Sequence, residues 1–115
     1  MTLFVLLAFS LSTTVSADIV VTDDAGRRVT LEQPARRIVS LAPYITELLF
    51  AAGAGAALVG VSEFSDYPAA ARGIQRIGGG GGLDQEPIVA LRPDLVIAWQ
   101  SGNPTGQVAR LQALG

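Results

Sequence analysis

Four aromatic side chains stand just after predicted strands, where they could bind a bulky ligand: Tyr44, Phe64, Tyr67 and Trp99. The carboxyl ends of the strands in an open parallel sheet form the crevice in which ligands bind. Aromatic rings in such loops offer apolar contact area with little rotamer entropy to lose. Several of their polar neighbours, such as Ser65, Gln100 and Asn103, are uncharged, which suits a large, partly apolar ligand better than an ion. The alternative is that these rings only pack against the sheet edge.

The composition excludes several kinds of catalytic and metal site within this chain. The 115 residues contain no Cys and no His, so thiolate nucleophiles, Ser-His-Asp triads and His-ligated metals are absent. Eight cationic residues, all Arg, stand against ten acidic ones, and no basic run marks a nucleic-acid binder. Half of the residues are hydrophobic, which argues against disorder. The length fits one domain, or one lobe of something larger.

Two local patterns imitate catalytic motifs. The glycine run at residues 78–82 lacks the Gly-Lys-Ser/Thr ending of a Walker-type phosphate loop, and we interpret it as a flexible loop. Glu63 and Asp66 form a pair of nearby carboxylates, the residue type of acid–base hydrolases. Two acids in one loop are more often solvated or cap the next turn, so we predict no catalytic residues.

Apolar runs alternate with helical stretches and predict an α/β fold. The predicted strands are 19–22 and 28–31, which flank a turn and form a hairpin, followed by 38–41, 58–61 and 95–99. The predicted helices are 46–52, 85–91 and a final one with Val108 and Leu111 on its apolar face. In this interpretation Pro43 stops the third strand, and Thr46 opens the helix that follows. The alternation implies a parallel sheet covered on both faces.

The first seventeen residues have the pattern of a cleaved secretory signal. A short apolar run at residues 3–9 precedes Val15-Ser16-Ala17, which places small residues where a signal peptidase cuts. The run is too short to span a bilayer, which needs about 20 residues. The alternatives are a buried N-terminal strand or a misassigned start codon. The pattern predicts an exported product that starts near Asp18.

The residues also resemble a known family. Arg37-Ile38-Val39-Ser40-Leu41-Ala42-Pro43 is similar to the opening of the periplasmic cobalamin-binding proteins of ABC importers. Residues 61–68, the stretch 88–99 that ends in Pro93-Asp94-Leu95-Val96-Ile97-Ala98-Trp99, and Gly102-Asn103 extend the similarity. It covers residues 37–115. The opening and the preceding hairpin also resemble the wider class of siderophore, haem and cobalamin receptors.

The resemblance implies two α/β lobes of a class III periplasmic binding protein, joined by a rigid long helix, with cobalamin held between them. Residues 18–36 would be a hairpin and linker and 37–115 the N-terminal lobe; the second lobe is missing, so we expect a fragment. The implied ligand surface is Pro43, Tyr44, Phe64, Tyr67, Trp99 and Asn103. Phe64 stands where these receptors commonly have a tyrosine. Glu86 matches the acid by which such a lobe docks on arginines of the membrane permease.

The family implies a periplasmic monomer that binds cobalamin as transported ligand, without a cofactor and without catalysis. One alternative is a haem or ferric-siderophore receptor of the same class. A second is an exported α/β enzyme whose catalytic residues lie in an absent half. A third is a non-functional fragment with uncovered sheet edges.

Overall fold

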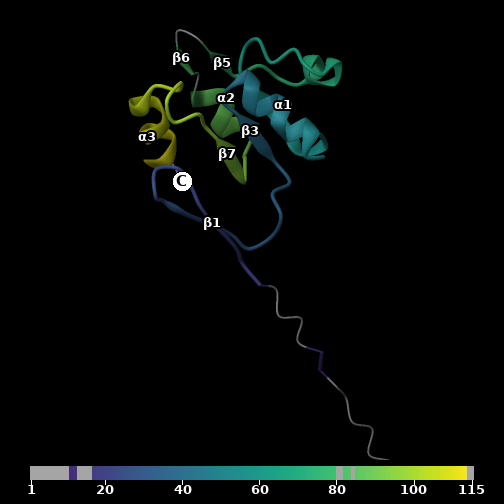
Figure 1. Cartoon of the computed structure of the whole chain (residues 1–115), viewed down its shortest axis with the longest axis vertical. Helices are drawn as coiled ribbons and strands as arrows, with labels where there is room; N and C mark the ends of the chain where they lie inside the picture. Colours follow the sequence, from purple (N-terminus) through teal and green to yellow (C-terminus); the bar gives the residue numbers. More distant parts are fainter. Residues whose placement is uncertain (1–10, 13–16, 80–81, 84, 114–115) are drawn as a thin grey trace, which may run out of the picture.

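The computed structural model describes residues 11–12, 17–79, 82–83 and 85–113 (Figure 1). The predicted signal peptide at residues 1–17 therefore lies almost wholly outside the described residues. Strands are β1 Ile19–Thr22, β2 Arg28–Leu31, β3 Ile38–Ser40, β4 Leu58–Val61, β5 Gly78–Gly79, β6 Gly82–Leu83 and β7 Leu95–Ile97. Helices are α1 Pro43–Ala51, α2 Gln85–Ala90 and α3 Thr105–Ala113, with short 3-10 turns η1 Gly55–Ala57 and η2 Ala69–Gly73. Among the described helices, none has the length and apolar character needed to cross a bilayer.

The N-terminal hairpin has the predicted strands and turn. Strands β1 and β2 pair antiparallel, with Ile19 opposite Leu31 and Thr22 opposite Arg28. The Asp23 carboxylate accepts hydrogen bonds from the backbone N–H groups of Ala25 and Arg27, and Gly26 supplies the positive φ of 79° that closes the turn. Strand β1 is exposed along its whole length, and the hairpin lies below the main sheet in Figure 1.

The central sheet is parallel and has the order β4-β3-β7. Ile38 at the start of β3 pairs with Leu58 on one side and with Leu95 on the other. Apolar side chains project from both faces of the sheet. Val39 packs with Ile77 and Ile88 on one face, and Ile38 packs with Leu58 and Val61 on the other. The prediction of a parallel sheet flanked by helices and preceded by a hairpin is confirmed.

Helix α1 begins three residues earlier than predicted, at Pro43 rather than Thr46. Proline is well tolerated at the first helical position, because its missing N–H would have no partner there and its φ already suits a helix. Pro43 therefore starts the helix as well as ending the strand region. As a result Tyr44 belongs to the first turn of α1, and Thr46 is buried beneath it.

Two further expectations need correction. Strand β7 ends at Ile97 and its three residues are half-buried, whereas the sequence predicts a strand over 95–99. The glycine run is not simply a flexible loop, because Gly78–Gly79 and Gly82–Leu83 form a short antiparallel pair. Glycines carry no side chain to signal a strand, so the run gives a sequence pattern typical of a loop.

One carboxylate fastens the start of β3 to the start of β7. The Asp94 carboxylate accepts hydrogen bonds of 2.8 and 2.9 Å from the backbone N–H groups of Arg36 and Arg37, and the Arg37 guanidinium donates to the Leu91 carbonyl. Desolvation raises the pKa of Asp94, but these backbone hydrogen bonds and the Arg37 charge outweigh it and bring the pKa below its ordinary value. This contact fixes where the linker after the hairpin enters the sheet.

Candidate functional site

Tyr44 and Trp99 come together at the carboxyl edge of the sheet. Tyr44 is on α1, directly after β3, and Trp99 follows β7 by two residues. Their ring centroids are 6.3 Å apart with the planes inclined at 58°, a tilted arrangement that aromatic pairs favour. The side chains are 57% and 49% exposed. Two large aromatic rings that remain half open to solvent provide surface for an apolar ligand.

A groove of about 510 Å³ runs beside this pair. Its apolar wall comes from one side of α1 and from the segment after β7, and it is lined by Tyr44, Ile45, Leu48, Leu49, Ala52, Ile97, Ala98, Trp99, Gln100 and Ser101. Asp24 of the hairpin turn completes the lining and is its one carboxylate among the described residues. The groove therefore combines an apolar floor with few polar groups, which is the usual make-up of a small-molecule site.

Trp99 is held by the turn that follows it. Its backbone N–H donates to Oδ1 of Asn103 at 2.6 Å, and its carbonyl accepts from the N–H groups of Gly102 and Asn103 at 3.1 and 2.8 Å. Nδ2 of Asn103 donates to the Leu41 carbonyl at 2.8 Å, at the end of β3. The turn is thus closed on itself and tied to the central strand.

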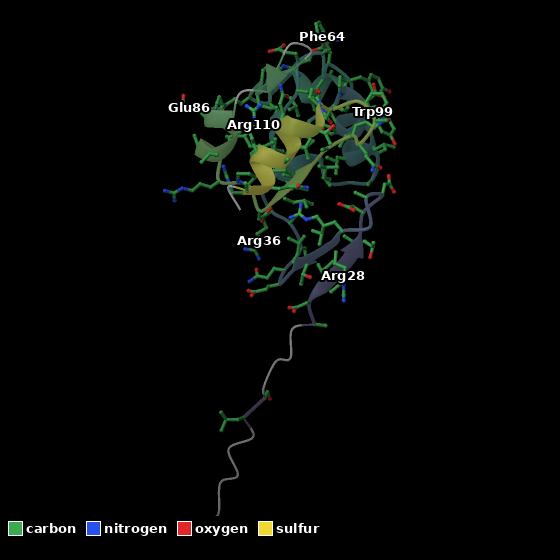
Figure 2. All side chains as sticks on the ribbon, turned by 90° about the vertical axis from the view of Figure 1, so that its left-hand side faces the viewer. Arg28, Arg36, Phe64, Glu86, Trp99 and Arg110 are labelled. Carbon is green, nitrogen blue, oxygen red and sulfur yellow. The ribbon has the colours of Figure 1, made fainter. Side chains whose placement is uncertain are left out.

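Phe64 projects from the loop after β4 in a conformation that non-glycine residues rarely adopt. Its φ is 65° and its side chain is 78% exposed. A left-handed backbone at a bulky residue costs about 1 kcal/mol or more, and persists only where the surroundings hold it. Figure 2 shows Phe64 at the end of the molecule opposite the hairpin residue Arg28. The same loop carries Tyr67, which is 70% exposed.

Four buried hydroxyl groups hold the Phe64 loop against α1. The Thr46 hydroxyl lies 2.9 Å from that of Ser40 and 3.0 Å from that of Ser65, and the Ser62 and Ser65 hydroxyls are 3.1 Å apart. The Ser40 hydroxyl donates to the Ala42 carbonyl at 3.0 Å. All four side chains are at most 2% exposed. The network therefore joins the end of β3, the first turn of α1 and both sides of Phe64.

Arg76 closes the Phe64 loop from outside. Its guanidinium donates to the carbonyls of Ser62 and Ser65 and forms an ion pair of 2.8 Å with Asp66. One arginine thus bridges residues on either side of Phe64. Asp66, one of the two neighbouring carboxylates of this loop, therefore has a structural partner. No cluster of potential metal ligands occurs among the described residues.

The structure brings some of the predicted site residues together and separates others. The rings of Tyr44 and Trp99 are neighbours, and Pro43 is exposed at the start of α1, the helix that carries Tyr44. Phe64 and Tyr67 share a loop on the β4 side of the sheet, and do not line the groove. Glu86 is exposed in the first turn of α2, on the opposite side of the molecule from Trp99 in Figure 2. None of the four aromatic rings is buried.

Sequence reasoning did not identify the residues that hold these rings. Arg76 appeared as one of eight scattered arginines, and the serines and Thr46 are common residue types with no distinctive spacing. Asn103 was assigned to the ligand surface, whereas both ends of its amide have partners within the chain. The available signal was Gly102-Asn103, a dipeptide typical of turns, which begins three residues after Trp99.

Comparison with known proteins places the chain among binding proteins. Residues 38–113 match the family model described as periplasmic binding protein. The Vitamin B12-binding protein of Vibrio cholerae is 50% identical over 82 residues, which are 71% of this chain and 30% of that protein. That of Yersinia pestis is 47% identical over 83 residues, 72% of this chain and 30% of that protein. The chain thus spans about a third of the length of these relatives.

Solved structures give the same result. The crystal structure of the periplasmic vitamin B12 binding protein BtuF of Vibrio cholerae has a TM-score of 0.69 at 50% identity, over 71% of this chain and 32% of that chain. The heme binding protein HmuT has a TM-score of 0.74 at 27% identity, over 90% of this chain and 34% of that chain. With a family match that extends from the first central strand to the last described helix, this chain belongs to the periplasmic binding protein family.

Proposed function

We propose that this chain is the N-terminal ligand-binding lobe of a protein that captures cobalamin in the periplasm and delivers it to the permease of an ABC importer. The observation that carries the proposal is the exposed pair Tyr44 and Trp99, set beside an apolar groove at the carboxyl edge of a parallel sheet. The 50% identity to a Vitamin B12-binding protein supports a corrinoid as the ligand. The mechanism is binding without chemical change.

The proposed ligand surface consists of Pro43, Tyr44, Phe64, Tyr67, Trp99 and the loop at Asn103. Apolar faces of the corrin ring and of the aromatic side chains leave water together, which favours binding by about 25 cal/mol per Å². Uncharged groups such as Ser101 and Gln100 lie at the groove and are suited to bind the ligand's polar substituents. Residues 18–36 form the hairpin and linker of this proposal, and residues 37–115 form the lobe.

The remaining parts of the proposal concern the protein in the cell. Residues 1–17 act as a signal peptide that directs the chain to the periplasm. The mature protein is a monomer, and the exposed Glu86 meets arginines of the permease. No nucleic acid and no resident cofactor take part.

Haem is the second candidate ligand, and one observation favours it. The heme binding protein HmuT is similar over 90% of this chain, more than the 71% over which BtuF is similar. However, the chain contains no His and no Cys, so within it tyrosine is the remaining type of iron ligand in the candidate site. Tyr44 and Tyr67 are the exposed tyrosines that would have to coordinate the iron.

Spectral titration with two probes separates these candidates. We expect cyanocobalamin to bind and to quench the fluorescence of Trp99, and haemin to bind more weakly. Trp99→Ala should weaken cyanocobalamin binding about tenfold, since loss of a buried aromatic contact costs about 1.5 kcal/mol. Val89→Ala is the matched control, because it removes an exposed apolar side chain from α2, away from the groove. Equal affinity of wild type and Trp99→Ala by calorimetry would remove Trp99 from the site.

A further inference from the structure

Asn103 is placed so that its amide can be used in only one orientation. The Trp99 N–H on one side requires an acceptor, and the Leu41 carbonyl on the other side requires a donor. An Asn side chain offers one of each, and the residue is partly buried. Leu41 itself is buried, and its N–H donates to the Ile97 carbonyl, so this anchor belongs to the rigid part of the sheet.

Gly102 provides the space in which the indole ring lies. A Cβ atom at this position would fall 2.6 Å from Cζ3 of Trp99 and closer still to Cε3, distances that real Cβ atoms do not show. The ring therefore lies directly over the Gly102 backbone. Any other residue at position 102 would force the indole to move.

We propose that Asn103 and Gly102 are positioning residues that hold Trp99 in its ligand-binding orientation before a ligand arrives. Asn103 fixes the Trp99 backbone against β3, and Gly102 supports one face of the ring. The remaining surface of the ring stays open beside Tyr44. Only the expected effect on affinity rests on the proposed function. The fixed orientation of the Trp99 ring is a property of the free protein.

The consequence for affinity is a smaller entropic cost of binding. A loop and its side chain that become ordered only on binding lower the affinity, whereas a turn and ring that are already fixed in the free protein do not incur this entropic cost. Loss of the positioning residues, with Trp99 kept, should weaken cyanocobalamin binding by about two- to tenfold.

Trp99 is the only tryptophan in the sequence, so its fluorescence reports on this site alone. In the ligand-free chain we expect high residual anisotropy and slow quenching by acrylamide. Asn103→Ala should lower the anisotropy and speed the quenching. Asn103→Asp should have an intermediate effect, because it keeps the acceptor for the Trp99 N–H and loses the donor to Leu41.

Gly102→Ala should displace the ring and change its emission spectrum. Gly106→Ala is the matched control, since a Cβ atom there would meet nothing within 4 Å. A freely rotating indole in the wild-type chain would overturn the proposal even if every variant failed to fold. Unchanged anisotropy and quenching in folded Asn103→Ala and Gly102→Ala would also overturn it.

The same samples distinguish this inference from the proposed function. An ordered Trp99 that Asn103→Ala releases, in a chain to which neither cyanocobalamin nor haemin binds, would support the positioning role and contradict the proposed function. Binding of cyanocobalamin to a chain whose Trp99 is mobile would support the function and contradict the positioning role.

Discussion

At the scale of single residues, the chain uses two physical means to present aromatic rings to solvent. Trp99 is held by hydrogen bonds to its own backbone and by the missing side chain of Gly102. Phe64 is held in a left-handed backbone conformation by partners on both sides. In each case polar or small residues set the position of the ring, while the ring itself contributes little to the core.

A substitution at Phe64 should separate stability from binding. Asparagine tolerates a positive φ much better than phenylalanine, and a side chain that is 78% exposed contributes little burial. We expect Phe64→Asn to leave the free energy of unfolding unchanged or to raise it by up to about 1 kcal/mol. Cyanocobalamin affinity should nevertheless fall. Urea denaturation and calorimetry measure the two effects.

A control for this prediction lies in the hairpin. Val21 is an exposed apolar residue of β1 with an ordinary strand backbone, so Val21→Asn should give no gain in stability and no change in affinity. Loss of stability in Phe64→Asn of more than 1 kcal/mol would contradict the interpretation that the φ of Phe64 is maintained at a cost.

At the scale of elements, the buried hydroxyls connect three separate segments of the chain. Ser40 ends β3, Thr46 lies in the first turns of α1, and Ser65 lies in the loop after β4. Buried polar groups are costly when unpaired, and none of the described buried side-chain polar atoms lacks a partner. The network thus specifies how α1 and the loop meet.

Thr46→Val should show what this network contributes. Valine keeps the shape of threonine and removes the hydroxyl that two other hydroxyls contact. We expect the free energy of unfolding to fall by about 1–3 kcal/mol. The exposed Thr30→Val on β2 is the matched control and should change it by less than about 0.5 kcal/mol. Equal effects of the two substitutions in urea denaturation would show that the network is not stabilising.

The sequence predicts the elements better than the contacts between them. The hairpin strands and β4 have the expected bounds, because short β-prone runs between turn residues depend on local chemistry. The start of α1 was misplaced because Pro43 fits both a strand end and a helix start. The left-handed Phe64 carries no sequence signal, since glycine or asparagine would mark such a position. The hydrogen bond from Asn103 to Leu41 could not be predicted, because the two residues are distant in the chain.

At the scale of the whole molecule, the proposed ligand surface and the proposed docking residue are separated. Glu86 lies on α2, across the molecule from Trp99, with α3 and Arg110 between them in Figure 2. Permease contact through Glu86 would therefore leave the groove beside Tyr44 uncovered. The proposal therefore predicts that substitution can change ligand binding and docking independently.

Charge reversal at Glu86 tests this separation. Glu86→Arg should leave cyanocobalamin affinity within about twofold of wild type, because Glu86 lies away from the groove. The new arginine would instead repel the arginines that the proposal places on the permease. Uptake of labelled cobalamin by cells that depend on this protein should fall at least tenfold. Val89→Ala, on the same helix, is the control for general damage to α2. Normal uptake by the Glu86→Arg variant would refute the docking role.

The hydrogen bond between Ser65 and Thr46 has a mechanical consequence. It links the loop that bears Phe64 to the helix that bears Tyr44, so the two backbone segments from which these rings project are held against each other. The distance between the loop and the helix is then set by the fold. On the proposed ligand surface, a solute too small to touch both rings would gain only part of the contact energy, so the proposal predicts selection of the ligand by its width.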